Sequence, residues 1–313
     1  MAMTRSLNTD FEVWSHDRWS IPLPEGHKFP ISKYSLLRER VQDRVLVRES
    51  DAVPWEWLAA VHEQDLLDRI RTGQMSIREQ RGLGLPWSEV LVERGRRSVG
   101  GTLAAAQRAI ISGVGMNLGG GTHHAGRDFA RGYCLFNDVA VTLARLRSEG
   151  TARRAVIVDC DVHQGDGTAH ILGPDEDAFT LSLHGARNYP FQRIPSDLDV
   201  DLETGTGDDA YLAALSDALD VALGGAAPDV AFFLAGADPW HGDRLGRLAL
   251  TKDGLRARDV LVLDTLRGEG IPVCVVLAGG YAPDVTDTVD INAATAAEVA
   301  ARVTPSAGAE VPA

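Results

Sequence analysis

Four side chains in this sequence have the types and spacing of metal ligands. Asp159, Asp161 and His163 lie two residues apart in the segment VDCDVHQGDG, so they would share one face of an extended strand. Burying two carboxylates at the end of an apolar strand is costly unless a cation or hydrogen-bond donors compensate. With Asp238, which follows a second apolar run, Asp161 and His163 would form a three-ligand site with an open position, as in catalytic Zn²⁺ centres. Alternatively, these carboxylates only cap the turns after the strands.

Two glycine-rich segments could supply the other groups of a hydrolytic site. His123 and His124 follow the glycine run of GGGTHHA, where the backbone can approach a ligand closely. Two imidazoles near a metal ion could act as general base and general acid, with carboxylates fixing their tautomers. Tyr281 follows the glycines of LAGGY, and its hydroxyl could donate to an oxyanion. Standing alone, the histidines would be interpreted as a surface pair and the tyrosine as a core residue.

These groups follow short apolar runs with the composition of buried strands. Strands are predicted at 44–48, 115–118, 155–161, 178–184, 229–237 and 272–280. Helical spacing of apolar residues predicts helices at 33–44, 54–71, 89–112, 137–149, 209–224 and 253–269. This alternation predicts one α/β domain, with a parallel sheet covered by helices on both faces. Ligands of such sheets bind beyond the carboxyl ends of the strands.

Length, composition and charge narrow the class of protein. The 313 residues are 44% hydrophobic and 24% charged, which fits a folded globular chain and excludes disordered and collagen-like proteins. The formal net charge is −13 and lysines are rare, so we expect no direct nucleic-acid ligand. Residues 71–88 are expected to form a loop at a substrate rim or an interface, and the tail after about residue 304 to be frayed.

Cysteine usage and hydropathy favour a cytoplasmic protein. Cys134, Cys160 and Cys274 are odd in number, widely spaced and set in apolar runs, which is typical of reduced, buried thiols. The first residues lack the apolar stretch of a signal peptide, and no window approaches 18 uninterrupted apolar residues. We therefore expect neither secretion nor a membrane span.

Five motifs, in this order and spacing, resemble the zinc-dependent histone deacetylase family. They are GGGTHHA (119–125), GYCLFNDVAV (132–141), IVDCDVHQGDGTA (157–169), LAGAD (234–238) and LAGGY (277–281). The resemblance extends from PEGHKFPISKY to about residue 295, and DVHQGDG, HGARNYPF and LAGGYAPDVTDTV look closest to bacterial proteins grouped with the class IV deacetylases. It implies a single arginase/deacetylase-type domain, residues 1–313, with an eight-stranded parallel sheet.

The resemblance also implies an activity and a role for each group. The activity would be zinc-dependent removal of an acetyl or other acyl group from the ε-amino group of lysine, in a protein or peptide. By position, the zinc ligands would be Asp161, His163 and Asp238. The catalytic groups would be the general base and acid His124 with Asp166, the assisting His123 with Asp159, and the oxyanion donor Tyr281.

Two further sites of the family can be placed on this chain. A structural potassium ion would sit against Asp159, Ser182 and the backbone of Asp161, His163 and Leu183. The acyl-lysine tunnel would be lined by Gly132, Tyr133, one of Tyr189 and Phe191, Leu245 and Gly280. Tyr133 replaces the usual phenylalanine, which puts the acyl preference in question but removes no catalytic group.

Three alternatives stay open from the sequence. The first is a deacetylase of acetylpolyamines or other small N-acyl amines, which the acidic net charge weakly favours. Eukaryotic polyamine enzymes have an acidic residue at the position of Leu245, which weakly favours acyl-lysine instead. The second is a two-metal centre of the arginase type, but this would need aspartates where the chain has Gly165 and Trp240. The third is an inactive acyl-lysine binding module, although every catalytic position is filled.

Overall fold

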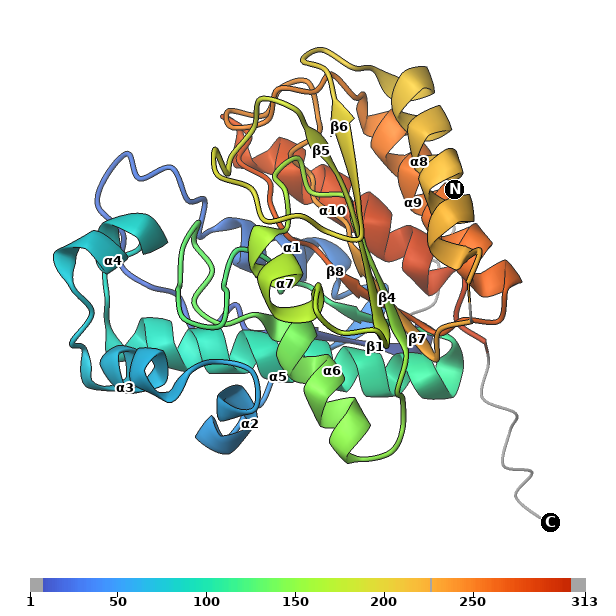
Figure 1. Cartoon of the computed structure of the whole chain (residues 1–313). Coiled ribbons are helices and arrows are strands. Elements are labelled where there is room, and N and C mark those ends of the chain that lie inside the picture. Colours follow the sequence, from blue (N-terminus) through green and yellow to red (C-terminus); the bar gives the residue numbers. More distant parts are fainter. Residues whose placement is uncertain (1–7, 226, 305–313) are drawn as a thin grey trace.

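In the computed structural model, which describes residues 8–225 and 227–304, eight parallel strands form one sheet (Figure 1). The strand order across the sheet is β2-β1-β3-β8-β7-β4-β5-β6. The strands are β1 (Asn8–Ser15), β2 (Val45–Glu49), β3 (Val114–Asn117), β4 (Ala155–Asp159), β5 (Ala178–Gly185), β6 (Leu198–Leu202), β7 (Val230–Leu234) and β8 (Val273–Val276). The predicted α/β domain with a parallel sheet is confirmed.

Helices cover both faces of this sheet. They are α1 (Lys33–Val41), α2 (Trp55–Ala59), α3 (Gln64–Thr72), α4 (Ile77–Leu83), α5 (Glu89–Ser112), α6 (Asp138–Ser148), α7 (Asp166–Leu172), α8 (Asp208–Leu223), α9 (Lys252–Gly268) and α10 (Val285–Ala300). In β4, Val156 and Val158 pack with residues of α1, α8, α9 and α10, whereas Ala155 and Ile157 pack with residues of α5 and α6. Burial on both faces explains why this strand is apolar from Ala155 to Val158.

Helix α5 shows how local sequence sets the limits of an element. The side chain of Ser88 accepts a 3.1 Å hydrogen bond from the N–H of Leu91 and so caps the amino end. The helix ends at Gly113, whose φ of 82° lies in the left-handed region that glycine adopts readily. These end signals agree with the helix predicted at 89–112.

Two segments before α5 differ from the prediction. The helix expected over 54–71 is divided into α2 and α3, because the N–H of Glu63 bonds to the carbonyl of Arg127 and draws the chain out of the helix. The segment 71–88 was expected to be a loop, but it contains α4. Ser76 and Glu79 form a capping box at the start of α4, which is the local signal that this expectation overlooked.

Sequence patterns also do not predict β1, β6, α7 and α10. Strand β6 lies at the edge of the sheet and is mostly half-buried, so it lacks the continuous apolar run of the inner strands. Helix α7 has only seven residues and begins inside the DVHQGDG motif, where the glycines predict a turn. Helix α10 is rich in alanine, threonine and aspartate, so its apolar stripe is weak.

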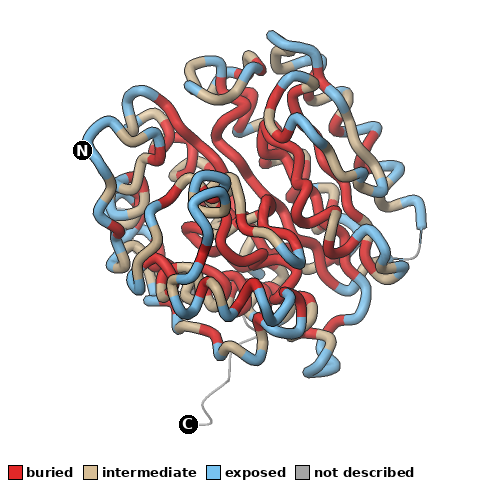
Figure 2. The backbone as a smooth tube through the Cα atoms, turned by 60° about the vertical axis from the view of Figure 1, so that its left-hand side comes forward, coloured by how far each residue is buried: buried red, intermediate tan, exposed pale blue. Residues whose placement is uncertain are grey.

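The strand order brings the chemically interesting residues to one edge. Strand β4 pairs with β5 and β7, and β8 pairs with β7, all in parallel. Their carboxyl ends therefore meet, and β3, β4, β7 and β8 are buried along their length (Figure 2). No helix among the described residues is long and apolar enough to cross a membrane. The tail expected to fray lies, from residue 305 on, outside the described residues.

Candidate active site

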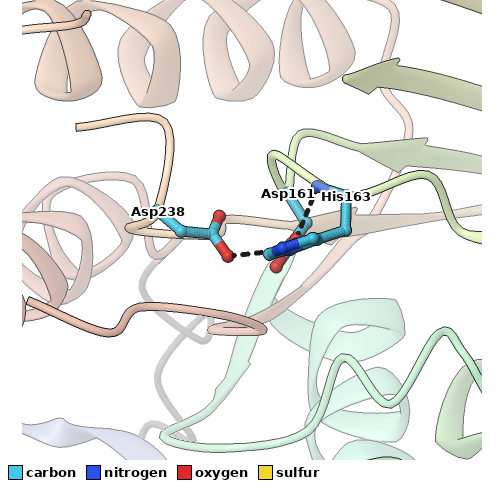
Figure 3. Close-up of side chains that lie close together, drawn as sticks. All are labelled: Asp161, His163 and Asp238. Carbon is cyan, nitrogen blue, oxygen red and sulfur yellow. Dashed lines mark hydrogen bonds and ion pairs between the residues drawn. The ribbon is translucent and has the colours of Figure 1, made fainter. Parts of the chain in front are cut away.

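Three buried side chains converge where β4 and β7 end (Figure 3). Ligand-type atoms of Asp161, His163 and Asp238 lie within 4.8 Å of one another. Nδ1 of His163 is 2.8 Å from Oδ1 of Asp161 and 3.3 Å from Oδ2 of Asp238. The N–H of Gly279 donates to Oδ2 of Asp161 at 2.7 Å. The N–H of Val162 donates to Oδ1 of Asp238 at 2.9 Å, so the backbone orients both carboxylates.

This donor set fits a zinc ion. Two carboxylates and one imidazole match the oxygen and nitrogen ligands of open catalytic zinc sites. Oδ2 of Asp238 is buried and, apart from its 3.3 Å ion-pair contact with His163, accepts no hydrogen bond from the described residues, although buried carboxylate oxygens are normally satisfied. Burial and the charge of Asp161 raise the pKa of Asp238 to about 7. Burial would lower the pKa of His163, but the two carboxylates raise it to about 10. A bound cation would relieve this concentration of negative charge.

Each histidine of GGGTHHA is paired with a carboxylate. Nδ1 of His123 is 2.6 Å from Oδ2 of Asp159. Nδ1 of His124 is 2.5 Å from Oδ1 of Asp166. Because Nδ1 carries the hydrogen bond, Nε2 of each ring is left for another partner. Nε2 of His123 lies 3.9 Å from Oδ1 of Asp161, which places this pair beside the metal-ligand group.

The two imidazoles have opposite pKa shifts. Burial would lower the pKa of His123, but Asp159 and Asp161 raise it to about 9. Burial and the charge of His123 lower the pKa of His124 to about 4, although Asp166 opposes this. At neutral pH, His124 is thus the ring that can accept a proton, whereas His123 is charged.

Asp166 has a second partner that the sequence motifs do not reveal. The guanidinium of Arg131 pairs with Oδ2 of Asp166 and lies over the ring of Phe129. Burial would raise the pKa of Asp166, but His124 and Arg131 lower it. The carboxylate is therefore held as an anion that fixes the His124 ring.

Tyr281 reaches the site from the segment after β8. Its N–H donates to Oδ2 of Asp243 at 2.6 Å. Nζ of the buried Lys33 lies 3.3 Å from the carbonyl oxygen of Ala278 and 3.5 Å from that of Gly280. The same ammonium is 5.5 Å from the centre of the Tyr281 ring. Burial raises the pKa of the Tyr281 hydroxyl well above its ordinary value, which keeps it a hydrogen-bond donor.

A cavity of about 340 Å³ leads to these groups. Tyr133, Tyr189 and Leu245 line it together with His124, His163 and Tyr281. Tyr189 lies deeper, with its ring 4.9 Å from that of His124, whereas Phe191 lines the same cavity but is 88% exposed.

Two glycines expected in the tunnel occupy different places. Gly132 lines the cavity, and a Cβ there would lie 2.5 Å from Cδ2 of His124, so only glycine fits beside that ring. Gly280 is not among the described residues that line the cavity. A Cβ on Gly280 would instead approach Ala237 and Thr288, so this glycine packs closely against those two side chains.

The residues expected to hold a potassium ion gather around the turn after β4. Asp159 stands opposite Ser182 in the ladder between β4 and β5. Oδ1 of Asp159 accepts from the N–H of Asp161 at 3.1 Å, and Oγ of Ser182 accepts from the N–H of Gly165 at 3.4 Å. Leu183 follows Ser182 in β5, so the expected set lies on adjoining strands.

Several supporting residues were missed because they act across long sequence distances. Asp138 accepts hydrogen bonds from the N–H groups of Gly121 and Thr122 and so holds the histidine segment. The buried Arg258 donates to the carbonyl of Gly236, two residues before Asp238. Lys33, Asp243 and Arg131 act in the same way at the sites described above. No local pattern marks such residues, although Asp138 lies in the GYCLFNDVAV motif.

Comparisons with known proteins identify the family of this chain. The model of the family described as "Histone deacetylase domain" matches residues 27–297. The chain is 42% identical over 284 residues to an uncharacterised protein of Picosynechococcus sp., covering 89% of this chain and 95% of that protein. It is 32% identical over 194 residues to acetylpolyamine amidohydrolase 1 of Pseudomonas aeruginosa, covering 58% of this chain and 54% of that protein. This chain spans about half to two thirds of the length of several other curated relatives.

A solved structure supports the fold assignment. The crystal structure of an HDAC homologue complexed with SAHA matches with a TM-score of 0.79 and 22% sequence identity, covering 96% of this chain and 86% of that one. At this identity the likeness establishes the fold, while the family model establishes the relationship over most of the chain. The chain belongs to the histone deacetylase family and is a hydrolase that acts on amide C–N bonds.

Proposed function

We propose that this protein removes an acetyl or other acyl group from the ε-amino group of lysine with the help of a zinc ion. One arrangement carries the proposal. The group of Asp161, His163 and Asp238 lies beside two His–Asp pairs and Tyr281, at the inner end of a cavity whose outer end is exposed. Membership of an amide-hydrolysing family supports the same reaction.

Asp161, His163 and Asp238 would hold the zinc ion, which when bound would polarise the acyl carbonyl and lower the pKa of water. The buried Oδ2 of Asp238, which accepts no hydrogen bond from the described residues, supports this assignment. Gly279 and Val162 would keep the carboxylates oriented through their N–H groups. A potassium ion near Asp159, Ser182 and Leu183 would stabilise the turn that carries two of the ligands.

His124 would move the protons of the reaction. Its Nδ1–H donates to Asp166, which fixes the tautomer and leaves Nε2 to accept a proton from the attacking water. The same nitrogen would then give that proton to the lysine nitrogen as the C–N bond breaks. The remaining acid proton then passes to the amine, so the products are a carboxylate and an ammonium group, and atoms and charge balance. His123, held by Asp159, would add positive charge beside the developing oxyanion.

Tyr281 would donate its hydroxyl hydrogen to the oxyanion of the tetrahedral species. Asp243 and Lys33 hold its segment by the contacts described above, so the donor is fixed before the substrate arrives. The rings of Tyr133 and Tyr189 line the approach and suit the aliphatic stem of an acyl-lysine.

An acetylpolyamine is the second candidate substrate. The similarity to an acetylpolyamine amidohydrolase of Pseudomonas aeruginosa and the net charge of −13 favour it. A polyamine keeps a second ammonium outside the cavity, where Leu245 offers no charge to receive it. We therefore place acyl-lysine first.

The test is a substrate panel on zinc-loaded protein. Peptides with acetyl-, trifluoroacetyl- or myristoyl-lysine are compared with acetylspermidine and acetylputrescine by amine release. We expect zinc-dependent hydrolysis with the highest kcat/KM on a lysine peptide. A higher value on a polyamine would support the second candidate, and peptide binding without turnover of any substrate would indicate an inactive module.

We also propose a cytoplasmic setting and a relationship to class IV deacetylases. Cys134, Cys160 and Cys274 are buried free thiols, which supports a reducing compartment. The class proposal is supported by the motif details alone. A clear preference for myristoyl- over acetyl-lysine would favour it, because class IV relatives include enzymes that remove fatty-acyl groups.

A further inference from the structure

The mouth of the cavity carries a charge opposite to that of the whole chain. The chain has a net charge of −13, yet Arg81, Arg187 and Arg247 line the cavity and are exposed. No Asp or Glu of the described residues lines it. The three arginines come from separate segments, namely α4, the loop after β5 and the loop after β7. The fold therefore gathers positive charge at this opening from distant parts of an acidic sequence.

These three guanidinium groups also have no partner among the residues that the structure describes. Within the described ranges, none of them has a side-chain hydrogen bond, ion pair or aromatic contact. Neighbouring arginines differ: Arg131 pairs with Asp166, and Arg193 pairs with Asp201. An arginine that supports the fold is normally engaged by a carboxylate or carbonyl, whereas an unpaired one can bind an anionic group of a ligand.

An exposed aromatic ring stands beside this charge. Phe191 lines the same cavity and is 88% exposed. Arginine together with an aromatic residue is typical of the parts of protein surfaces that bind other proteins. A small amine inside the cavity would leave Phe191 in water, whereas a polypeptide segment across the mouth could cover it.

We propose that the natural substrate is an acyl-lysine within an acidic segment of a protein. Its flanking Asp or Glu side chains pair with Arg81, Arg187 and Arg247, and an apolar neighbour packs on Phe191. This inference rests on the proposed function, because it takes acyl-lysine as the group that enters the cavity. A lysine-rich tail or a polyamine brings like charge to the same mouth and is disfavoured there.

The first experiment compares three acetyl-lysine peptides of equal length whose flanking residues are Glu, Ser or Lys. We expect kcat/KM on the Glu peptide to exceed that on the Ser peptide by about 10-fold at low salt, from three exposed ion pairs of a few-fold each. The Lys peptide should be the poorest of the three. The ratio should approach one in about 1 M salt, where exposed charges are screened.

The triple variant R81Q/R187Q/R247Q tests whether these residues cause the preference. It should bring the Glu-to-Ser ratio to about 1 at low salt. Arg78→Gln is the matched control, because Arg78 is exposed on the same helix but does not line the cavity, and it should keep the wild-type ratio. An unchanged ratio in the triple variant, or a wild-type preference for the Lys peptide, would overturn the inference.

Binding separates this inference from the proposed function. Fluorescence anisotropy with labelled forms of the same three peptides measures their dissociation constants, and therefore the preference of the cavity mouth, without turnover. Tighter binding of the Glu peptide with no hydrolysis would contradict acyl-lysine hydrolysis but support recognition of an acidic segment at the cavity mouth. Hydrolysis without any charge preference would support acyl-lysine hydrolysis and contradict recognition of an acidic segment. The absence of a preference in both assays would overturn the inference. A kcat/KM on free Nε-acetyl-lysine equal to that on the Glu peptide would also overturn the inference, because no polypeptide would then be needed.

Discussion

The backbone N–H of Gly279 donates a 2.7 Å hydrogen bond to Oδ2 of Asp161. This contact joins the segment that ends in Tyr281 to a ligand group at the end of β4. A Cβ at position 279 would lie 1.9 Å from Oδ2 of Asp238 and 2.5 Å from Oδ2 of Asp161. Only glycine leaves room for both carboxylates, so the LAGGY motif shapes the candidate metal site as well as positioning Tyr281.

Gly279→Ala should weaken zinc binding by about 10- to 100-fold, because the methyl group displaces both carboxylates and their orienting contact. Competition with a chelator measures the affinity. Gly268→Ala is the control, since nothing lies within 4 Å of a Cβ at the end of α9, and it should bind zinc as the wild type does. Equal zinc affinity in the two variants would contradict the assignment of the ligands.

Tyr281→Phe should lower kcat by at least about 10²-fold, the effect of removing an oxyanion donor. The ring can stay in place, because its backbone is held through Asp243. Zinc content should be unchanged, which distinguishes the loss of a donor from the loss of the site. Turnover near the wild-type value would show that this hydroxyl does not act in the reaction.

Leu245→Glu should raise kcat/KM on acetylspermidine relative to an acetyl-lysine peptide by about 5-fold, the effect of one exposed ion pair with the distal ammonium. Leu245→Gln introduces a side chain of the same shape as Glu but without its charge. It should leave the ratio of the two kcat/KM values near that of the wild type. If the two variants behave alike, charge at this position does not select between the substrates.

The stability of the fold should depend on the neutral ring of His62. Its Nδ1–H donates to the carbonyl of Gly126, and Nε2 accepts from the N–H of Asn137. Burial lowers the pKa of His62 from 6.5 to about 4, so the unfolded chain takes up the proton more readily than the folded one. This contribution is fully present above pH 6.5 and is lost as the pH falls towards 4.

The loss should amount to about 3 kcal/mol of unfolding free energy over that interval. Urea unfolding at several pH values, for the wild type and His62→Gln, measures it. The variant should be less stable at neutral pH, because it loses one of two hydrogen bonds, but its stability should fall less steeply with acid. Parallel curves for the two proteins would contradict the role of this ring.

The part of the site that depends on strand ends could be predicted from the sequence. Strands β4 and β7 are apolar on both faces, so the first polar residues after them mark the edge of the sheet. Asp161 and His163 follow Asp159, the last residue of β4, and Asp238 is the first charged residue after β7; the structure brings these three together. The five motifs then indicated the family, which the family model confirms.

The supporting contacts could not be predicted, because they depend on tertiary distance. Lys33 and Ala278 are 245 residues apart in the chain, yet the ammonium group of Lys33 donates a hydrogen bond to the carbonyl oxygen of Ala278. Arg131 is one arginine among many, and only the folded chain shows that it shares Asp166 with a histidine. Helix α4 was missed for a different reason, since its Ser-x-x-Glu signal is present but its apolar stripe is short.

The central claim is that Asp161, His163 and Asp238 hold a zinc ion needed for amide hydrolysis. The most direct test measures zinc per chain and acetyl-lysine hydrolysis on the same samples of wild type and Asp161→Ala. The wild type should bind one zinc ion, lose turnover with a chelator and regain it with added zinc, whereas Asp161→Ala should lack both zinc and turnover. Loss of zinc from Asp161→Ala with hydrolysis unaffected would contradict the claim.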